Sequence, residues 1–177
     1  RSSDVMNDAL ISGSVDFGSQ QLRKRALASE LVAVLARLFT RYGNRVGAWR
    51  LLELLRSLSL PVTLLINSEL YTACPELVAA FRNEGAEIAS HGRTNSEHQA
   101  GLAEPDERAL IEHVTRTIAE HEGHAPAGWL SPWIAETERT PDLLHEAGYR
   151  YLLDWCMDDQ PVWMATRSGR ILALPYP

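Results

Sequence analysis

The sequence has few of the features that mark secreted proteins, membrane-spanning proteins or proteins with a structural metal site. Its 177 residues include only two cysteines, Cys74 and Cys156, which lie far apart and form no CxxC pair. This spacing argues against a disulfide framework or a cysteine zinc site. There is no apolar run of membrane-spanning length, no charged-then-apolar leader and no Asn-x-Ser/Thr sequon. We therefore expect a cytoplasmic protein that has no membrane partner.

Basic residues are too few for a general nucleic-acid-binding surface. The 17 Lys and Arg residues are outnumbered by 23 Asp and Glu residues, so the net charge is −6. Proteins that bind nucleic acids normally concentrate positive charge, and we expect no nucleic-acid partner here. The sequence also lacks the GxxxxGK[ST], GxGxxG, GxSxG and HExxH motifs, so nucleotide chemistry and a serine nucleophile have no support.

What the sequence does contain is an alternation of short apolar runs with amphipathic helical patterns. Strands are predicted at 62–67, 86–90, 127–130, 149–155 and 170–177, and helices at 21–42, 44–58, 75–85, 105–123 and 140–148. Gly43 is expected to end the first helix and Asn44 to cap the second. The alternation predicts parallel βαβ units around one hydrophobic core, with functional side chains at the carboxyl ends of the strands.

Polar clusters follow three of these predicted strands. In "HGRTNSEH" (91–98), His91 comes directly after an apolar run, where an imidazole can bind a metal or polarise a carbonyl. The alternative is that His91 only hydrogen-bonds to neighbouring backbone. In "GWLSPW", Trp129 and Trp133 could form the wall of a pocket for a ring-shaped substrate, or could pack in the core.

The third cluster is "DWCMDDQP": Asp154 and Trp155 end the predicted strand at 149–155, and Asp158 and Asp159 lie in the loop that follows. Asp154 could act as a base or orient a histidine. Asp158 and Asp159 fit solvated turn positions better. All three clusters are expected to meet at one end of a parallel barrel.

Four segments of the chain together resemble a known superfamily. They are "YGNRVGAWRLLELL", "EIASHGRTNSEHQAGL", "GWLSPWIAETERTPDLLHEAGYRYLLDWCMDDQP" and "ILALPYP". They are similar to the polysaccharide deacetylases (NodB homology, carbohydrate esterase family 4), and most similar to the intracellular allantoinase and cyclic imide hydrolase-like branch. The resemblance covers about residues 41–177. It leaves residues 1–40 as an atypical helical segment before a deacetylase-like domain.

The resemblance implies a fold and an activity. The fold is α/β, a NodB-type deformed (β/α) barrel, which here is incomplete at both ends. The activity is hydrolysis of carbon–nitrogen bonds other than peptide bonds, as part of carbohydrate metabolism or on a small linear or cyclic amide. Water is the expected nucleophile, since no activated Ser or Cys is present.

The sequence departs from the metal-dependent members of the family. Their Asp-Asp pair and H-x-x-x-H motif supply the metal ligands, and here His91 matches the first histidine while Asn95 stands at the second. Neutral amide oxygen is a much weaker ligand than imidazole, and His98 has the wrong spacing. Asp16 is the only candidate for the aspartate pair. We therefore expect either no cofactor or a single divalent metal, such as zinc, held by His91.

The resemblance also assigns roles to individual residues. His91 is expected to polarise the carbonyl or hold the metal, and Asp154 to act as base or to orient another group. The expected substrate-binding residues are Arg93 and Asn95, which would hold the substrate or its oxyanion, and Trp129 and Trp133, which would line the pocket. The expected substrate is a small-molecule amide or an N-acetyl sugar.

The missing motifs favour a second hypothesis. About five strands are too few to close a barrel, so that either a partner chain completes it, as in a homo-oligomer, or the chain is a fragment. The protein would then be a non-catalytic, truncated deacetylase-like domain with a ligand-binding or structural role. An open crevice at His91 would favour the hydrolase, and a His91 walled in by helices would favour the non-catalytic domain.

Overall fold

The computed structural model describes residues 42–175 of the chain. The chain divides into two compact units, residues 1–58 and 59–177. In the first unit, helical backbone runs from Tyr42 through the π-helix η1 (Gly43–Gly47) into α3 (Ala48–Ser57). The predicted helix end at Gly43 and cap at Asn44 are therefore wrong, because both residues lie inside continuous helical backbone. The predicted helix at 21–42 and Asp16 lie outside the described residues, except for Tyr42.

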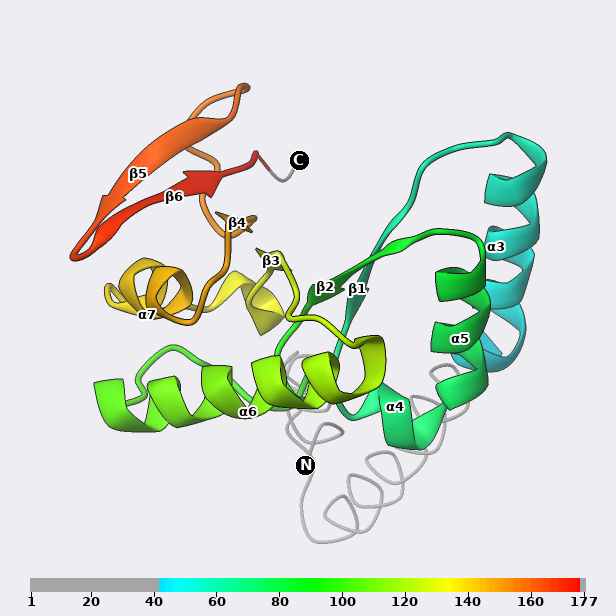
Figure 1. The fold of residues 1–177 in the computed structure, drawn as a ribbon, viewed down its shortest axis with the longest axis horizontal. Coiled ribbons are helices and arrows are strands. Elements are labelled where there is room, and N and C mark those ends of the chain that lie inside the picture. Colours follow the sequence, from blue (N-terminus) through cyan, green and yellow to red (C-terminus); the bar gives the residue numbers. More distant parts are fainter. Residues whose placement is uncertain (1–41, 176–177) are drawn as a thin grey trace, which may run out of the picture. The chain divides into compact units, whose positions relative to one another are not determined.

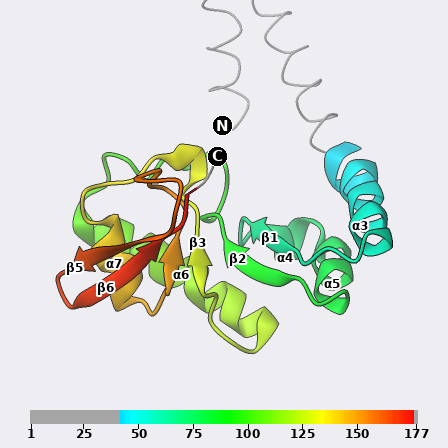
Figure 2. The same ribbon diagram turned by 90° about the horizontal axis from the view of Figure 1, so that it is seen from above.

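The second unit is built on a six-stranded sheet (Figure 1). Its strands are β1 (Thr63–Ile66), β2 (Glu87–Ser90), β3 (Gly128–Trp129), β4 (Tyr151–Leu152), β5 (Val162–Thr166) and β6 (Gly169–Ala173), in the order β1-β2-β3-β4-β6-β5. All neighbouring pairs are parallel except β5 and β6, which form an antiparallel hairpin at one end of the sheet (Figure 2). Five of these strands fall within or next to the predicted runs, and β5 was not predicted.

Helices connect β1 to β2, β2 to β3 and β3 to β4, because parallel neighbours cannot be joined by a tight turn. They are α4 (Leu70–Ala73) and α5 (Pro75–Asn83) between β1 and β2, α6 (Glu104–Glu122) between β2 and β3, and the 3-10 turn η2 (Pro132–Ile134) and α7 (Thr140–Glu146) between β3 and β4. Pro75 is the first residue of α5, where its missing N–H costs nothing. Gly123 ends α6 with a left-handed φ of 78°. No helix within residues 42–175 is long and apolar enough to cross a membrane.

The core lies between the sheet and its helices. Helix α6 packs against β2 and α7, and α7 packs against the β5–β6 hairpin. One face of α6 carries Ile111, Val114 and Ile118 at helical spacing, and all three are buried. The strands add Ile66, Ile88, Trp129, Leu152 and Ile171 to the same cluster. This arrangement fixes the sheet, and therefore the position of its carboxyl edge.

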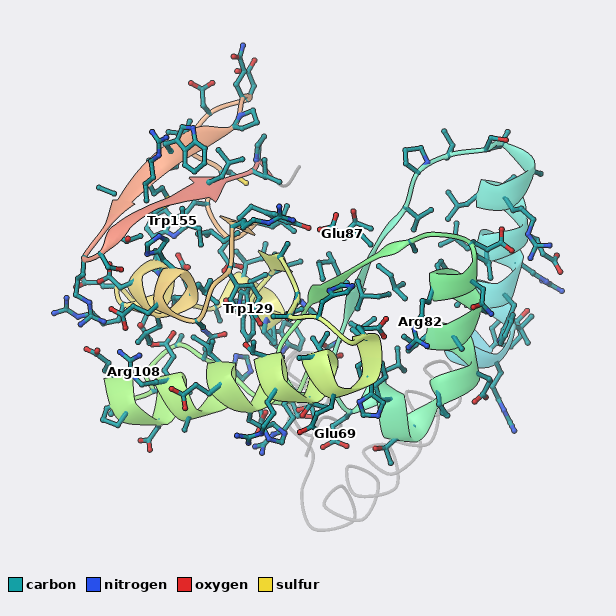
Figure 3. The ribbon with its side chains drawn as sticks, viewed as in Figure 1. Glu69, Arg82, Glu87, Arg108, Trp129 and Trp155 are labelled. Carbon is teal, nitrogen blue, oxygen red and sulfur yellow. The ribbon has the colours of Figure 1, made fainter. Side chains whose placement is uncertain are left out.

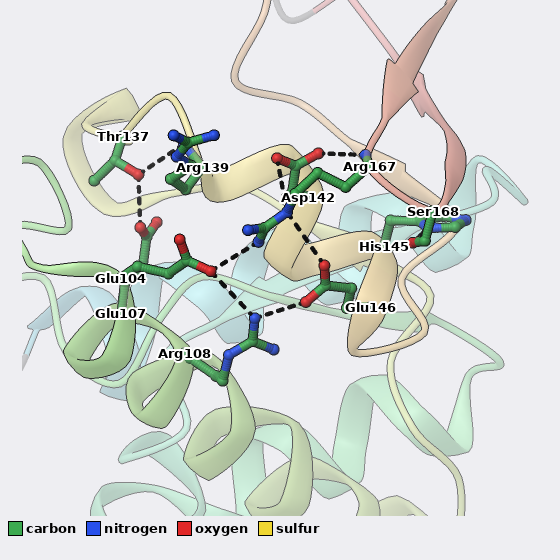
Figure 4. Close-up of polar contacts among 10 residues, drawn as sticks. All are labelled: Glu104, Glu107, Arg108, Thr137, Arg139, Asp142, His145, Glu146, Arg167 and Ser168. Carbon is green, nitrogen blue, oxygen red and sulfur yellow. Dashed lines mark hydrogen bonds and ion pairs between the residues drawn. The ribbon is translucent and has the colours of Figure 1, made fainter.

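Ion pairs tie the β5–β6 turn to the two neighbouring helices (Figure 4). Arg167 in the turn contacts Glu104 of α6 at 2.9 Å and Asp142 of α7 at 3.2 Å. Arg108 contacts Glu146 of α7 at 2.7 Å. The arginine of each pair is about two-fifths exposed, so each pair contributes little on its own. Their shared partners make one network that holds the hairpin in place beside α6 and α7.

We expect Glu122→Gln to lower the free energy of unfolding by about 2 kcal/mol, because a charge-assisted junction would lose its charge. The Glu122 side chain is 3% exposed and accepts hydrogen bonds from the Tyr71 hydroxyl and from two nitrogens of Arg82, each at 2.6 Å. These bonds join α4 and α5 to the end of α6. Arg82 on α5 is labelled in Figure 3. Urea denaturation measures the effect. The exposed Glu120→Gln on the same helix is the control, and an equal effect of the two substitutions would contradict this role for Glu122.

Candidate active site

The carboxyl ends of the parallel strands meet at one edge of the sheet. Where β2 ends, the His91 N–H donates to the Ile66 carbonyl at 2.7 Å, and where β3 ends, the Leu130 N–H donates to the Ser90 carbonyl at 2.9 Å. The loops that follow β2, β3 and β4 therefore start side by side. This confirms the expectation that the three polar clusters share one edge.

His91 is fixed in position by backbone contacts on both sides. Its Nδ1 lies 2.8 Å from the Leu130 carbonyl oxygen, and its own carbonyl accepts a hydrogen bond from the Asn67 amide. The next residue, Gly92, has φ +67°, and a Cβ there would lie 2.7 Å from Cγ of Pro132. Only glycine satisfies both the left-handed turn and the close approach to the loop after β3.

Burial sets the charge of the His91 ring, and the anchoring bond sets which nitrogen carries the hydrogen. Burial lowers the pKa of His91 below its usual value of 6.5, and the bond to Leu130 only partly opposes this shift. The ring is therefore neutral at pH 7. Because a carbonyl can only accept, Nδ1 carries the hydrogen and Nε2 holds the lone pair. His91 can accept a proton through Nε2, but in this tautomer it has no Nε2 hydrogen with which to polarise a carbonyl.

Asp154 is a buried carboxylate that is fully engaged by Ser131. Oδ1 accepts the Ser131 N–H at 2.6 Å, and Oδ2 accepts the Ser131 hydroxyl at 2.9 Å. The side chain is 8% exposed, and burial raises the pKa of Asp154 to about 6 while both Ser131 bonds oppose the rise. Since Ser131 directly follows Leu130, the same short segment of chain contacts both His91 and Asp154.

Glu136 is a further carboxyl group at this edge, and the sequence patterns did not predict it. Its Oε2 is buried and has no hydrogen-bond partner among the described residues, while the Trp155 side chain donates to the same carboxyl. Burial, and then the negative charges of Asp154 and Glu107, raise the pKa of Glu136 to about 8. Glu136 therefore carries a proton at pH 7. Nothing in the "AETE" stretch distinguishes it from the exposed Glu138.

Arg93 and Asn95 lie in the loop after β2, and the contacts observed for them do not involve His91. The Arg93 guanidinium forms two hydrogen bonds with Glu97, one of them at 2.9 Å. It lines a cavity of about 440 Å³ between this loop and α6, whose lining does not include His91. The Asn95 side chain is exposed, and its backbone carbonyl accepts the Trp133 indole N–H at 2.6 Å. Their predicted contact with substrate stays a prediction.

The two tryptophans of the "GWLSPW" cluster have different environments. Trp133 is 54% exposed and stacks on His98 with ring centroids 5.6 Å apart, so it is available to a ligand. Trp129, which is labelled in Figure 3, is fully buried. It donates its indole N–H to Ser131 at 2.9 Å and packs edge-on against Tyr149. The prediction that Trp129 lines a pocket is therefore wrong, because its side chain belongs to the core of the sheet.

The donor set at this edge does not fit a metal ion. Within residues 42–175, no three or more His, Cys, Asp or Glu side chains lie close enough together to hold one. The second histidine position of the family motif is occupied by Asn95, whose exposed amide is a weak ligand. His91 could offer only a single nitrogen through Nε2. The predicted zinc ligation by His91 has no further ligands among these residues, and we derive no chemical step through a metal.

Comparison with known proteins identifies the family. A family model described as polysaccharide deacetylase matches residues 42–152, which is more than half of the chain. The protein belongs to the polysaccharide deacetylase family. A second family model, described as a protein of unknown function (DUF58), matches residues 1–61. The resemblance predicted from the four sequence segments is confirmed.

Solved structures and a curated relative agree with this assignment. A putative polysaccharide deacetylase from Mycobacterium smegmatis is 30% identical with a TM-score of 0.72, covering 77% of this chain and 47% of that chain. The PuuE allantoinase is 29% identical with a TM-score of 0.69, covering 77% and 45% respectively. The peptidoglycan deacetylase of Helicobacter pylori (strain ATCC 700392 / 26695) is 28% identical over 110 residues, which are 62% of this chain and 37% of that protein.

These matches define the fold as well as the family. The fold is the NodB-type deformed (β/α) barrel, as predicted, and the described sheet forms part of it. The chain spans less than half the length of each of these three relatives.

Proposed function

We propose that the protein hydrolyses a carbon–nitrogen bond other than a peptide bond, in a linear or cyclic amide, with water as the nucleophile. Two relatives support this reaction class, because one is named as a peptidoglycan deacetylase and another as an allantoinase. The observation that carries the proposal is the charge and tautomer of the His91 ring. Its neutral ring is locked by Leu130 with Nε2 unprotonated, at the edge of the sheet where this fold class places its active sites.

In the proposed mechanism His91 is the general base. As the water oxygen attacks the amide carbon, Nε2 takes one water proton and the ring becomes a cation, stabilised by the bond from Nδ1 to the Leu130 carbonyl. Asp154 holds Ser131, and with it the segment that anchors the ring. Trp133 offers an exposed indole for the flat or apolar face of a substrate. Arg93 and Asn95 are proposed as contacts with substrate at the rim.

The substrate class follows from the same features. The exposed indole of Trp133 and a water-activating imidazole suit a small amide, a cyclic ureide or imide, or an N-acetyl sugar. A role in carbohydrate metabolism, a cytoplasmic location and a homo-oligomeric state remain predictions from the sequence.

We expect His91→Gln to reduce kcat/KM by roughly 10²- to 10⁴-fold, as loss of a general base does. The full chain is assayed with allantoin, succinimide and a chitin tetrasaccharide, each with and without a chelator. His124→Gln, at the exposed residue just after α6, is the control and should leave the rate unchanged. A His91→Gln variant as active as the wild type would remove His91 from the mechanism.

A further inference from the structure

The loop after β3 adopts an unfavourable backbone conformation just before it reaches Glu136. Trp133 and Ile134 are consecutive non-glycine residues with φ of +64° and +52°. Left-handed backbone is disfavoured for such side chains, and most of all for a β-branched one. Hydrogen bonds from the Ile134 N–H to the Ser131 carbonyl and from the Trp133 indole to Asn95 hold the turn in place. Strained turns of this kind concentrate at functional sites.

The surroundings of Glu136 disfavour the charged form of its carboxyl group. Two anions act on its carboxyl, Asp154 from the loop after β4 and Glu107 from α6, and one indole, that of Trp155, donates to it. One oxygen, Oε2, has no partner among the described residues. A buried acid without a cation beside other acids is stable only as the neutral form. Oε2 itself is shielded from solvent, whereas Glu136 as a whole residue is only partly buried and its neighbour Trp155 is 41% exposed.

The three carboxyl groups of Glu107, Asp154 and Glu136 differ in how many of their oxygens are already hydrogen-bonded. Glu107 accepts hydrogen bonds from Gln99, Thr137 and Thr140. Both oxygens of Asp154 are engaged by Ser131. Glu136 alone of the three combines an uncommitted oxygen with a bound proton at neutral pH.

We infer that Glu136 supplies the proton that the departing nitrogen needs, and that Asp154 is a positioning residue that holds Ser131. The inference rests on the proposed hydrolysis. Water adds to the amide carbon and gives one proton to Nε2 of His91. Glu136 then protonates the nitrogen as the carbon–nitrogen bond breaks, and amine and carboxylic acid leave. Proton transfer from the His91 cation to the Glu136 carboxylate restores both groups, so every proton is accounted for.

The pH dependence of kcat/KM tests this assignment. We use the full chain, with whichever of allantoin, succinimide and the chitin tetrasaccharide it hydrolyses fastest. The wild-type rate should fall on the alkaline side near pH 8, where Glu136 loses its proton. Glu136→Gln should lower kcat/KM at least 100-fold at pH 7 and abolish the alkaline fall. Asp154→Asn should lower the rate but keep the alkaline fall, and the exposed Glu138→Gln should change neither.

A leaving group that needs no proton provides the second readout. On 4-nitrophenyl acetate, Glu136→Gln should lose less than 10-fold, whereas a variant that merely distorts the site would lose equally on ester and amide. Equal losses on both substrates, or an unchanged alkaline fall in Glu136→Gln, would overturn the inference while the proposed function stands. Hydrolysis of none of the three substrates by the wild type would overturn both.

Discussion

Glu136→Gln is expected to make the protein more stable than the wild type, by a margin that grows as the pH rises from 4.5 to 8. The pKa of Glu136 is raised from 4.5 to about 8 in the folded protein by burial and by Asp154 and Glu107. Folding therefore binds a proton in this range. The stability that the bound proton provides is complete below pH 4.5 and is lost as the pH rises through 8. Glutamine has no proton to lose and avoids the penalty.

The expected size of this effect is large for a single side chain. A rise in pKa from 4.5 to about 8 corresponds to roughly 5 kcal/mol when fully buried, and partial exposure should reduce it to about 2 to 3 kcal/mol above pH 8. Urea denaturation at pH 4.5, 6, 7.5 and 9 measures the margin, with Glu138→Gln as the exposed control. A variant that is less stable than the wild type at pH 9 would show that the Glu136 carboxyl is stabilised as an anion.

Glu107→Ala should cause the largest loss of stability of the substitutions considered, roughly 4 kcal/mol. Glu107 is fully buried on α6 and accepts hydrogen bonds from Gln99 Nε2 at 2.8 Å, from the Thr137 hydroxyl at 2.6 Å and from the Thr140 hydroxyl. The bond to Thr137 is drawn in Figure 4. Alanine would remove the acceptor that these three donors share, two of which belong to fully buried residues, and would open a cavity in the same place.

Two matched variants separate these causes. Glu107→Gln keeps the volume and one acceptor, so its loss should be less than half that of alanine. Glu112→Ala, an exposed glutamate on the same helix, should change the free energy of unfolding by less than about 0.5 kcal/mol. Thermal and urea denaturation measure all three. If Glu107→Ala lowered the free energy of unfolding no more than Glu112→Ala, the hydrogen bonds to Glu107 would not stabilise the fold.

Much of the fold could be predicted because single residues mark several helix boundaries. Pro75, Pro105 and Gly123 mark helix ends through their own backbone restrictions, so α5 and α6 were placed correctly. The strand β5 was missed because an antiparallel hairpin at the end of a parallel sheet depends on its partner β6 rather than on its own short run. The break at Gly43 was wrong because glycine is permissive rather than obligatory in stopping a helix.

The site was predictable only where a residue directly follows a strand. The placement of His91 and Asp154 at one edge was predicted in this way, since strand direction brings residues at or just after strand ends together, while their roles stay predictions. Whether Trp129 faces the core or a ligand depends on which side of a two-residue strand it occupies, and no periodicity exists over two residues. Glu136 could not be recognised, because its burial arises from a left-handed turn and from contacts of β4 and α6 that are remote in sequence.

Asn95 takes part in the loop through its backbone and not through its amide. Its main-chain oxygen accepts the Trp133 indole N–H, while the residue itself is exposed. A substitution at position 95 would therefore leave this contact intact. Histidine there would restore the H-x-x-x-H spacing with His91, but the aspartate pair of the metal-dependent members would still have only Asp16 as a candidate, so this one substitution would not rebuild their ligand set.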